Sequence, residues 1–458
     1  MCVRDGSRLR KLEVTDLHEG PNTISSSPQG DTLEKTKMST SAALGRVTSR
    51  FTTRLIIDPG PPPDGGLRAW TQVFCAWLAV TNTWGFVNSF GVFQTYYTEI
   101  LPQSPSTISW IGSTQACFMF SLGVVSGRAL DAGLFLPTVI AGVVLQLVGI
   151  FTMSLATNFW QLLLTQGICT GVGGGIFFTP VMGLSSTYFA KKKGMAIGII
   201  TTGNSIGGII YPLIVRQLLG PIGFGWTVRV LGLLNLVSLA VVIAFMKPRL
   251  PPRKSGPLVD PDAFRDIPYM LHSVGICFLM PPVYFVFYYI ASFARDELAM
   301  PYTTSLNMVI ILNGVGFPAR VIPGFIADRY IGALNTFIIC LFFTTVILFS
   351  WLGVNSIPSY FTFTVFYGMF SGAFQSLFAT TIAAYSSDIS KTGTRLGIGF
   401  ALIGIPALIG GPISGALLKV GGSYNVPIIW AGASTVVGTG FCVAARVVKH
   451  GWSWRIRC

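Results

Sequence analysis

The sequence is poor in charged residues: Asp, Glu, Lys and Arg make up 10% of its 458 residues, whereas hydrophobic residues make up 51%. A typical soluble domain carries about 25% charged residues. The shortage extends from about residue 70 to the end of the chain. A soluble protein of this length could not cover its surface with so little charge. This excludes a soluble enzyme and makes the lipid bilayer the expected solvent.

The residue patterns of metal, cofactor and catalytic sites are also missing. The eight cysteines contain no Cys-x-x-Cys pair, and His18, His272 and His450 are scattered, so neither a zinc site nor a disulfide framework is indicated. The glycines of 171–175 lie inside an apolar run with no preceding strand, which excludes a dinucleotide-binding loop. There is no phosphate loop and no nucleophile with a matching base. We therefore expect no cofactor, no metal and no ATP-driven pump.

What the chain has instead is a series of long apolar runs. About 20 helical residues cross the hydrocarbon core of a bilayer, and backbone polar groups there must be satisfied within the segment. The sequence therefore predicts an all-α membrane protein with twelve transmembrane helices. The predicted spans are 71–95, 108–129, 135–156, 160–182, 194–215, 226–246, 270–293, 303–326, 334–353, 359–383, 396–418 and 426–447.

Residues 1–63 differ from the rest of the chain. They are polar, rich in Ser and Thr and without periodicity, and they end in a proline-rich run, so the sequence predicts a disordered tail. They contain no apolar stretch of the kind that a signal peptide has.

The net charge of +14 comes from Lys and Arg that gather in alternate loops. The opposite loops hold little beyond Arg216, Arg295 and Lys419. Since Lys and Arg favour the cytoplasmic side of a membrane, both termini are expected in the cytoplasm. Membrane orientation accounts for the basic charge, so we expect no nucleic-acid partner.

Spacing of glycines indicates that the chain is duplicated. The pairs Gly167/Gly368, Gly171/Gly372, Gly198/Gly399 and Gly203/Gly404 are each 201 residues apart. This predicts two pseudo-symmetric six-helix bundles, the repeat logic of many secondary transporters. The predicted parts are a tail over 1–63, bundles over 64–246 and 269–447, a cytoplasmic linker over 247–268 and a tail over 448–458.

Two equivalent loops carry glycines and acids at the same spacing. An acid there can accept a hydrogen bond from a helix N-terminus or pair with a basic residue of a neighbouring helix. Glycine lets the ends of the two helices approach each other closely. We predict that these loops gate the molecule. The alternative is a tight loop with a solvated charge. The residues are Gly127, Asp131 and Gly133 in the first loop and Gly324, Asp328 and Arg329 in the second.

These loops resemble the signature of the major facilitator superfamily, and four further segments resemble the monocarboxylate transporter family, in particular its fungal branch. The resemblance implies a two-bundle fold, a central solute cavity and alternating access. The segments are 64–70 (DGGLRAW), 166–171 (QGICTG), 203–208 (GNSIGG, with Tyr211-Pro212 after it) and 404–412 (GIPALIGGP).

Arg320 is the residue of greatest interest because it lies deep in a predicted span. A charged residue there costs about 2.5–3.5 kcal/mol on insertion scales, so such residues are kept for function. Arginine binds a carboxylate through two parallel hydrogen bonds, and Asn313 shares its helix face. In the family, an arginine at this place is associated with an anionic substrate. The alternative is pairing with a backbone carbonyl or snorkelling to the interface.

The chain departs from the family's proton-coupled members at two positions. They carry an acid four residues before the arginine, where this chain has Gly316, and a lysine late in the first span, close to Asn88 here. No Asp or Glu lies inside any predicted span. The sequence therefore argues against carboxylate-based proton coupling, although a loop acid that moves into the cavity remains open.

Further polar residues share helix faces and are candidates for the cavity wall. For each, the alternative is an interhelical hydrogen bond, or for tyrosine a place in the interfacial belt. These candidates are Thr81 and Asn88 in the first span, Tyr284 and Tyr288 in the seventh, and Tyr367, Ser371 and Gln375 in the tenth.

Together these features predict a secondary transporter for a small organic solute with an anionic group. The fungal branch that the chain resembles includes exporters of secondary metabolites, and efflux of such a metabolite at the plasma membrane is the favoured hypothesis. Uptake of a monocarboxylate or a riboflavin-like vitamin is the alternative, and a non-transporting solute receptor is a second one. The expected partners are a small-molecule substrate and the bilayer, and the sequence is compatible with a monomer.

Overall fold

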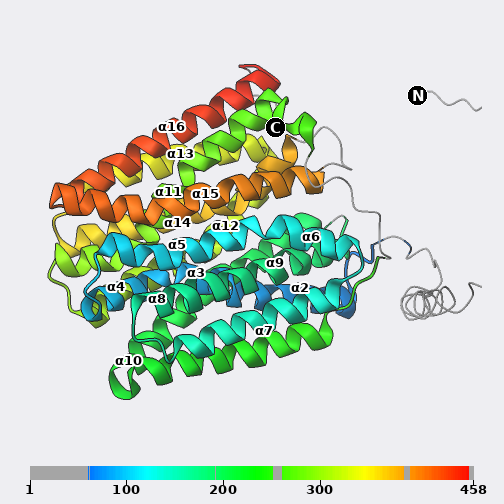
Figure 1. Cartoon of the computed structure of the whole chain (residues 1–458). Helices are drawn as coiled ribbons and strands as arrows, with labels where there is room; N and C mark the ends of the chain where they lie inside the picture. The colour runs from blue at the N-terminus through cyan, green and yellow to red at the C-terminus, as the bar shows by residue number, and fades with distance from the viewer. Residues whose placement is uncertain (1–59, 61, 191, 251–259, 386–391, 453–458) are drawn as a thin grey trace, which may run out of the picture. The chain divides into compact units, whose positions relative to one another are not determined.

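The computed structural model describes residues 60, 62–190, 192–250, 260–385 and 392–452, and most of the predicted N-terminal tail lies outside this part. Every regular element in the described part is a helix (Figure 1). This confirms the all-α fold that the long apolar runs predict.

The first half of the chain contains the helices up to residue 245. They are α2 (Gly66–Asn82), α3 (Trp84–Asn88), α4 (Phe90–Ile100), α5 (Pro105–Ser121), α6 (Gly123–Asp131), α7 (Phe135–Met153), α8 (Phe159–Leu162), η1 (Leu163–Cys169), α9 (Thr170–Ser186) and α10 (Lys193–Phe245).

The second half begins with a short 3-10 turn and continues with six long helices. Its elements are η2 (Pro261–Phe264), α11 (Ile267–Asp296), α12 (Tyr302–Ile326), η3 (Ala327–Ile331), α13 (Ala333–Ser350), η4 (Trp351–Gly353), α14 (Ile357–Ala384), α15 (Thr392–Gly421) and α16 (Asn425–His450).

In the described residues, nine helices are long and apolar enough to cross a membrane. One of them, Gly194–Phe245, contains two predicted spans, because Gly223 has the non-helical angles φ 74° and ψ 171° and the chain doubles back in α10 (Figure 1). The first predicted span corresponds to α2, α3 and α4, and the tenth to α14. The helices therefore account for all twelve predicted spans.

The first span differs from the single helix predicted over 71–95, because it is broken after Asn82 and Asn88. At each break a hydroxyl bonds to the carbonyl four residues back: Thr83 Oγ1 to Ala79 O at 2.8 Å, and Ser89 Oγ to Gly85 O at 2.7 Å. Such back-bonding competes with the helix ladder and bends helices.

A buried polar network ties the first half together. Gln146 Nε2 on α7 donates to Asn235 Oδ1 at 3.1 Å and to the Asn82 carbonyl at 2.8 Å. Tyr211 OH donates to Asn82 Oδ1 at 2.9 Å and accepts from Asn235 Nδ2 at 3.1 Å. Since a bilayer offers no water to these groups, partners within the bundle satisfy them.

The two halves meet along a few helix pairs. Helix α5 packs along α15, α10 packs along α12, and α4 contacts α11; Figure 1 shows α5 beside α15. Within the halves, α7 packs on α9 and α11 on α16. The exact bounds of the two bundles and of the linker over 247–268 stay predictions, and residues 251–259 lie outside the described part.

Close packing between α3 and α10 gives a test of this arrangement. A Cβ atom on Gly207 would lie 2.6 Å from Gly85 Cα, whereas a Cβ on Gly198 of the same helix would meet nothing within 4 Å. We expect Gly207→Ala to lower the melting temperature of the purified protein, since overpacking costs about 1–3 kcal/mol. Gly198→Ala is the matched control and should leave it unchanged or raise it slightly. Equal melting temperatures for the two variants would contradict the packing.

Candidate functional site

Arg320 lies on α12 where the two halves meet, and 4% of its surface is exposed. Its Nη1 donates to Ser205 Oγ on α10, in the other half of the chain. Its Nη2 lies 3.4 Å from Gln375 Oε1 on α14. The guanidinium therefore bonds to side chains of two other helices, as expected for a residue facing the middle of the molecule, and it does not snorkel.

Asn204, next to Ser205 on α10, extends this group to the first span. Asn88 Nδ2 donates to the Asn204 amide at 2.7 Å. In its alternative orientation, that amide places its oxygen 3.3 Å from Arg320 Nη2 and its nitrogen 3.1 Å from Trp84 O. We call Asn88, Asn204, Ser205, Arg320 and Gln375 the Arg320 cluster. It joins α3, α10, α12 and α14, and every hydrogen-bond partner of the guanidinium in it is neutral.

Gly316 leaves room for the guanidinium. A Cβ atom built at this position would lie 2.7 Å from Arg320 Nη1. The glycine therefore lets the arginine fold back along its own helix towards Ser205. The acid that the family's proton-coupled members carry at this position would stand directly beside the charge.

The other predicted residues of α12 and α14 are buried nearby. Asn313 packs against Gly208 of α10 and donates to Val309 O at 2.9 Å, while its Oδ1 has no partner in the described part of the chain. Tyr367 and Ser371 are buried on α14, and the Tyr367 hydroxyl likewise has no described partner. Asn313 thus offers an unused polar atom where α12 meets α10, and Tyr367 offers one on α14.

Tyr284, Tyr288 and Thr81 lie in other surroundings. The ring centroids of Tyr284 and Tyr288 are 5.5 Å apart, and Tyr288 lies 4.7 Å from the ring of Phe90 on α4, so the pair packs between the halves. Thr81 Oγ1 donates to Trp77 O at 2.9 Å and faces Gly203 of α10, which makes it a packing residue of the first half. The structure does not bring Thr81 to the Arg320 cluster.

The predicted gating loops are only partly described. Gly133 has φ 81°, a conformation that favours glycine, and Gly127 faces Thr179. A Cβ on Gly324 would meet nothing within 4 Å, and Arg329 lies over the rings of Phe325 and Tyr330. The side chains of Asp131 and Asp328 lie outside the described part, so the gating role of these acids stays a prediction.

A series of aromatic rings adjoins the Arg320 cluster. We did not predict these rings as site residues from the sequence. Trp84 lies 4.7 Å from Phe120 and 5.7 Å from Phe178, and Phe400 lies 6.2 Å from Phe120 and 5.5 Å from Phe378. We call these five residues the aromatic strip. The spacing signal was present, because Trp84 lies four residues before Asn88 and Phe378 three after Gln375, so they share helix faces.

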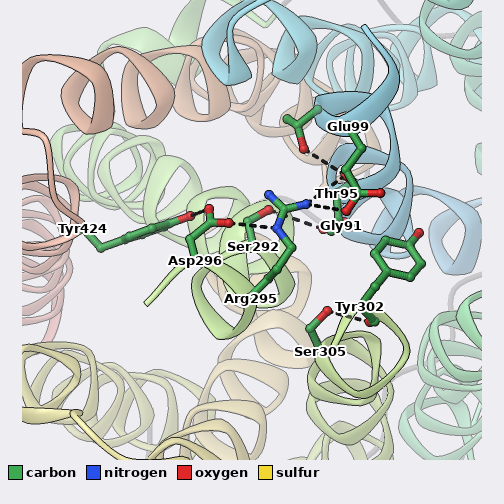
Figure 2. Close-up of polar contacts among 10 residues, drawn as sticks. Gly91, Thr95, Glu99, Ser292, Arg295, Asp296, Tyr302, Ser305 and Tyr424 are labelled. Carbon is green, nitrogen blue, oxygen red and sulfur yellow. Dashed lines mark hydrogen bonds and ion pairs between the residues drawn. The ribbon is translucent and has the colours of Figure 1, made fainter. Parts of the chain in front are cut away.

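A charged contact joins the halves elsewhere (Figure 2). Arg295 at the end of α11 bonds to Glu99 Oε1 of α4 at 3.0 Å and to Asp296 Oδ1 at 2.8 Å, and Thr95 Oγ1 lies 3.3 Å from Ser292 Oγ. We call Thr95, Glu99, Ser292, Arg295 and Asp296 the Arg295 latch. Asp296 also accepts a bond from Tyr424 OH at 2.9 Å.

Three more contacts close the same end of the molecule. Arg216 Nη1 of α10 donates to Asn307 Oδ1 of α12 at 2.5 Å. Ser106 Oγ donates to Pro412 O at 2.7 Å, and Tyr289 OH donates to Pro105 O at 3.2 Å. These bonds all run between the first and second half. The latch with its neighbours therefore holds the two halves together at the end whose loops are poor in Lys and Arg.

The latch predicts that Glu99, and not Asp296, controls contact between the halves at this end. With the native cysteines replaced, we expect Thr95→Cys and Ser292→Cys to crosslink rapidly under mild oxidation. Glu99→Gln should slow the crosslink because, in the described residues, Glu99 is the acid of the other half that pairs with Arg295. Asp296→Asn is the matched control, since this acid also pairs with Arg295 but lies on the same helix, and it should not slow the reaction. Equal slowing by both variants would contradict a cross-half latch.

Comparison with known proteins agrees with this architecture. The family model described as Major Facilitator Superfamily matches residues 73–355. An MFS-type transporter of Gibberella zeae is 43% identical over 393 residues, covering 85% of this chain and 89% of that protein. The aspyridones efflux protein of Emericella nidulans is 32% identical over 392 residues (85% and 80%), and the fujikurins efflux protein of Gibberella fujikuroi is 32% identical over 395 residues (84% and 84%).

Among solved structures, a bacterial homologue of the human lysosomal transporter Spinster, in an inward-facing and unoccupied conformation, has the same fold. The TM-score is 0.64 at 14% sequence identity, and the match covers 85% of this chain and all of that one. The family match and the relatives agree with an all-helical membrane transporter fold. The chain belongs to the major facilitator superfamily: it is an integral, multi-pass membrane transporter for a small molecule, and not an enzyme.

Proposed function

We propose that this transporter exports an amphipathic organic anion, of the kind produced by secondary metabolism, by alternating access between its two halves. The observation that carries the proposal is the guanidinium of Arg320, which is buried between the halves and bonded to neutral side chains. A carboxylate is the natural complement of such a group, because it accepts two parallel, charge-assisted hydrogen bonds from it.

The aromatic strip supports an apolar, ring-containing body for the same substrate. Trp84, Phe178, Phe378 and Phe400 are half-buried, so part of each ring is open to contact. An aromatic pair contributes about 0.5–1.5 kcal/mol beyond the area that it buries. An anionic head at Arg320 and a ring system against the strip are the two ends of one amphipathic molecule.

The relatives support export as the direction of transport. Two of them, at 32% identity, are named as efflux proteins for aspyridones and fujikurins. The segments at 64–70 and 404–412 support placement in the fungal branch of the monocarboxylate transporter family, with Gly316 and Asn88 as departures from its proton-coupled members. Uptake of a monocarboxylate or a riboflavin-like vitamin is the alternative, and the direction of net movement separates the two.

We further propose that the protein lies in the plasma membrane with both termini in the cytoplasm. The support is the distribution of Lys and Arg, which leaves the end of the Arg295 latch outside the cell. In this proposal a substrate reaches the Arg320 cluster from the cytoplasm while the latch and its neighbours join the halves at the outer end. An N-terminal tag should resist protease on intact cells and be digested after permeabilisation; digestion on intact cells would contradict this orientation.

Replacing Arg320 tests the proposed substrate. We expect Arg320→Gln to reduce release of aromatic carboxylates such as 1-naphthoate from preloaded proteoliposomes about 10- to 100-fold, since a hydrogen bond to a charged group contributes about 1.5–3 kcal/mol. Release is followed by naphthoate fluorescence, and a panel of aromatic and aliphatic carboxylates gives the preference for a ring-containing body.

Arg229→Gln is the matched control, because Arg229 is also an arginine of α10 but bonds to Ser154 within the first half, away from the Arg320 cluster and from the contacts between the halves. It should retain most of the release. If the wild-type protein and Arg320→Gln release every anion of the panel at the same rate, the proposed role of Arg320 is wrong. In cells, an anion that accumulates inside when the protein is present would favour the uptake alternative.

A further inference from the structure

We infer that the carrier works by exchange: it moves one organic anion out as another moves in, and its empty form changes sides slowly. The inference rests on the proposed role of Arg320 and specifies the mode of transport, which the role alone leaves open. It follows from the charge of the central site and from the contacts that cross between the halves.

The first step concerns charge. In the structure the guanidinium bonds to Ser205 and Gln375, and to Asn204 in one orientation of that amide. These bonds use at most three of its five N–H donors and leave its positive charge without a counter-charge among its described partners. The sequence offers no substitute at this depth, because none of the twelve predicted spans contains Asp or Glu.

The second step concerns the change of sides. Between its two open forms, an alternating-access carrier passes through a state in which both ends are closed and water is excluded. An arginine enclosed there without a counter-ion is unfavourable, because neutral partners do not replace the hydration of a full charge. A bound carboxylate supplies the missing charge. The loaded carrier should therefore pass through the closed state faster than the empty one.

The third step concerns the contacts across the halves. Ser205 belongs to α10 and Arg320 to α12, so the empty carrier uses its own central cation as a bridge between the halves. The Arg295–Glu99 ion pair adds a second bridge at the latch end. A substrate that takes over the guanidinium weakens the first bridge, so that the latch and the neighbouring contacts at its end remain to be opened. Both effects favour movement of the loaded form.

Gly316 allows the charge argument to be tested separately from the packing. A side chain at this position starts 2.7 Å from Arg320 Nη1, and the guanidinium is the flexible end of a long side chain that can shift. Gly316→Asp would therefore give Arg320 a permanent internal counter-charge. Gly316→Asn has nearly the same size and no charge, which makes it the matched control.

The experiment uses the full chain in proteoliposomes loaded with an anion of the panel whose release depends on Arg320. The pH is equal on both sides and the membrane potential is clamped with potassium and valinomycin. We expect release to be at least tenfold faster when the same anion is present outside than when it is absent, a difference of about 1.4 kcal/mol in barrier. Gly316→Asp should reduce this ratio towards one, and Gly316→Asn should keep it.

The outcomes separate the inference from the proposed function. Equal release with and without external anion in the wild type, together with loss of release in Arg320→Gln, would overturn exchange and leave the substrate role intact. No Arg320-dependent release of any anion of the panel would overturn the proposed function itself. An equal reduction of the ratio by Gly316→Asp and Gly316→Asn would show that the space at Gly316, and not the charge, controls the empty carrier, and would contradict the inference.

Discussion

The positive charge of Arg320, buried between the halves without an acid beside it, is the constraint on which the rest of the structure depends. Each helix near it contributes to holding this charge: α10 provides Ser205 and Asn204, α14 provides Gln375, and α12 provides the space at Gly316. A bilayer protein carries such a group only where it has a use, because insertion of an unpaired charge is costly. The fold buries this guanidinium and supplies hydrogen-bond partners to it, but the described partners do not neutralise its charge.

The roles proposed for the aromatic strip and for the Arg295 latch both depend on the Arg320 cluster. Two residues of the strip, Trp84 and Phe378, share helix faces with Asn88 and Gln375 of the cluster. The latch joins the halves at one end while the cluster joins them in the middle. The broken first span contributes to both regions, since α3 carries Asn88 and Trp84 and α4 carries Glu99 and Thr95. One irregular span therefore connects the Arg320 cluster to the Arg295 latch.

Much of the fold could be predicted from the sequence because a bilayer imposes simple rules. Length and hydropathy were enough to place twelve spans, and Arg320 was found because a charge inside an apolar run is conspicuous. The breaks at Thr83 and Ser89 were not found, since hydroxyl back-bonding leaves no composition signal. Ser205 and Asn204 were missed as partners of Arg320 because they lie 115 residues away or more and only tertiary packing brings α10 to α12. Thr81 was grouped with Asn88 by helical spacing; in the structure it packs against Gly203 of α10, and its place in a cavity wall stays a prediction.

Arg295 keeps an acid partner whether the latch is closed or open. Its side chain is 25% exposed, Glu99 is 45% exposed and Asp296 is 40% exposed, so each ion pair is wet and individually weak. When α4 moves away and takes Glu99 with it, Asp296 remains beside the guanidinium on the same helix, held in turn by Tyr424. When the halves separate at this end, Arg295 loses Glu99 but keeps Asp296, so its charge is not left without an acid. The latch end can therefore separate at little electrostatic cost, whereas the described hydrogen-bond partners of Arg320 at the centre are all neutral.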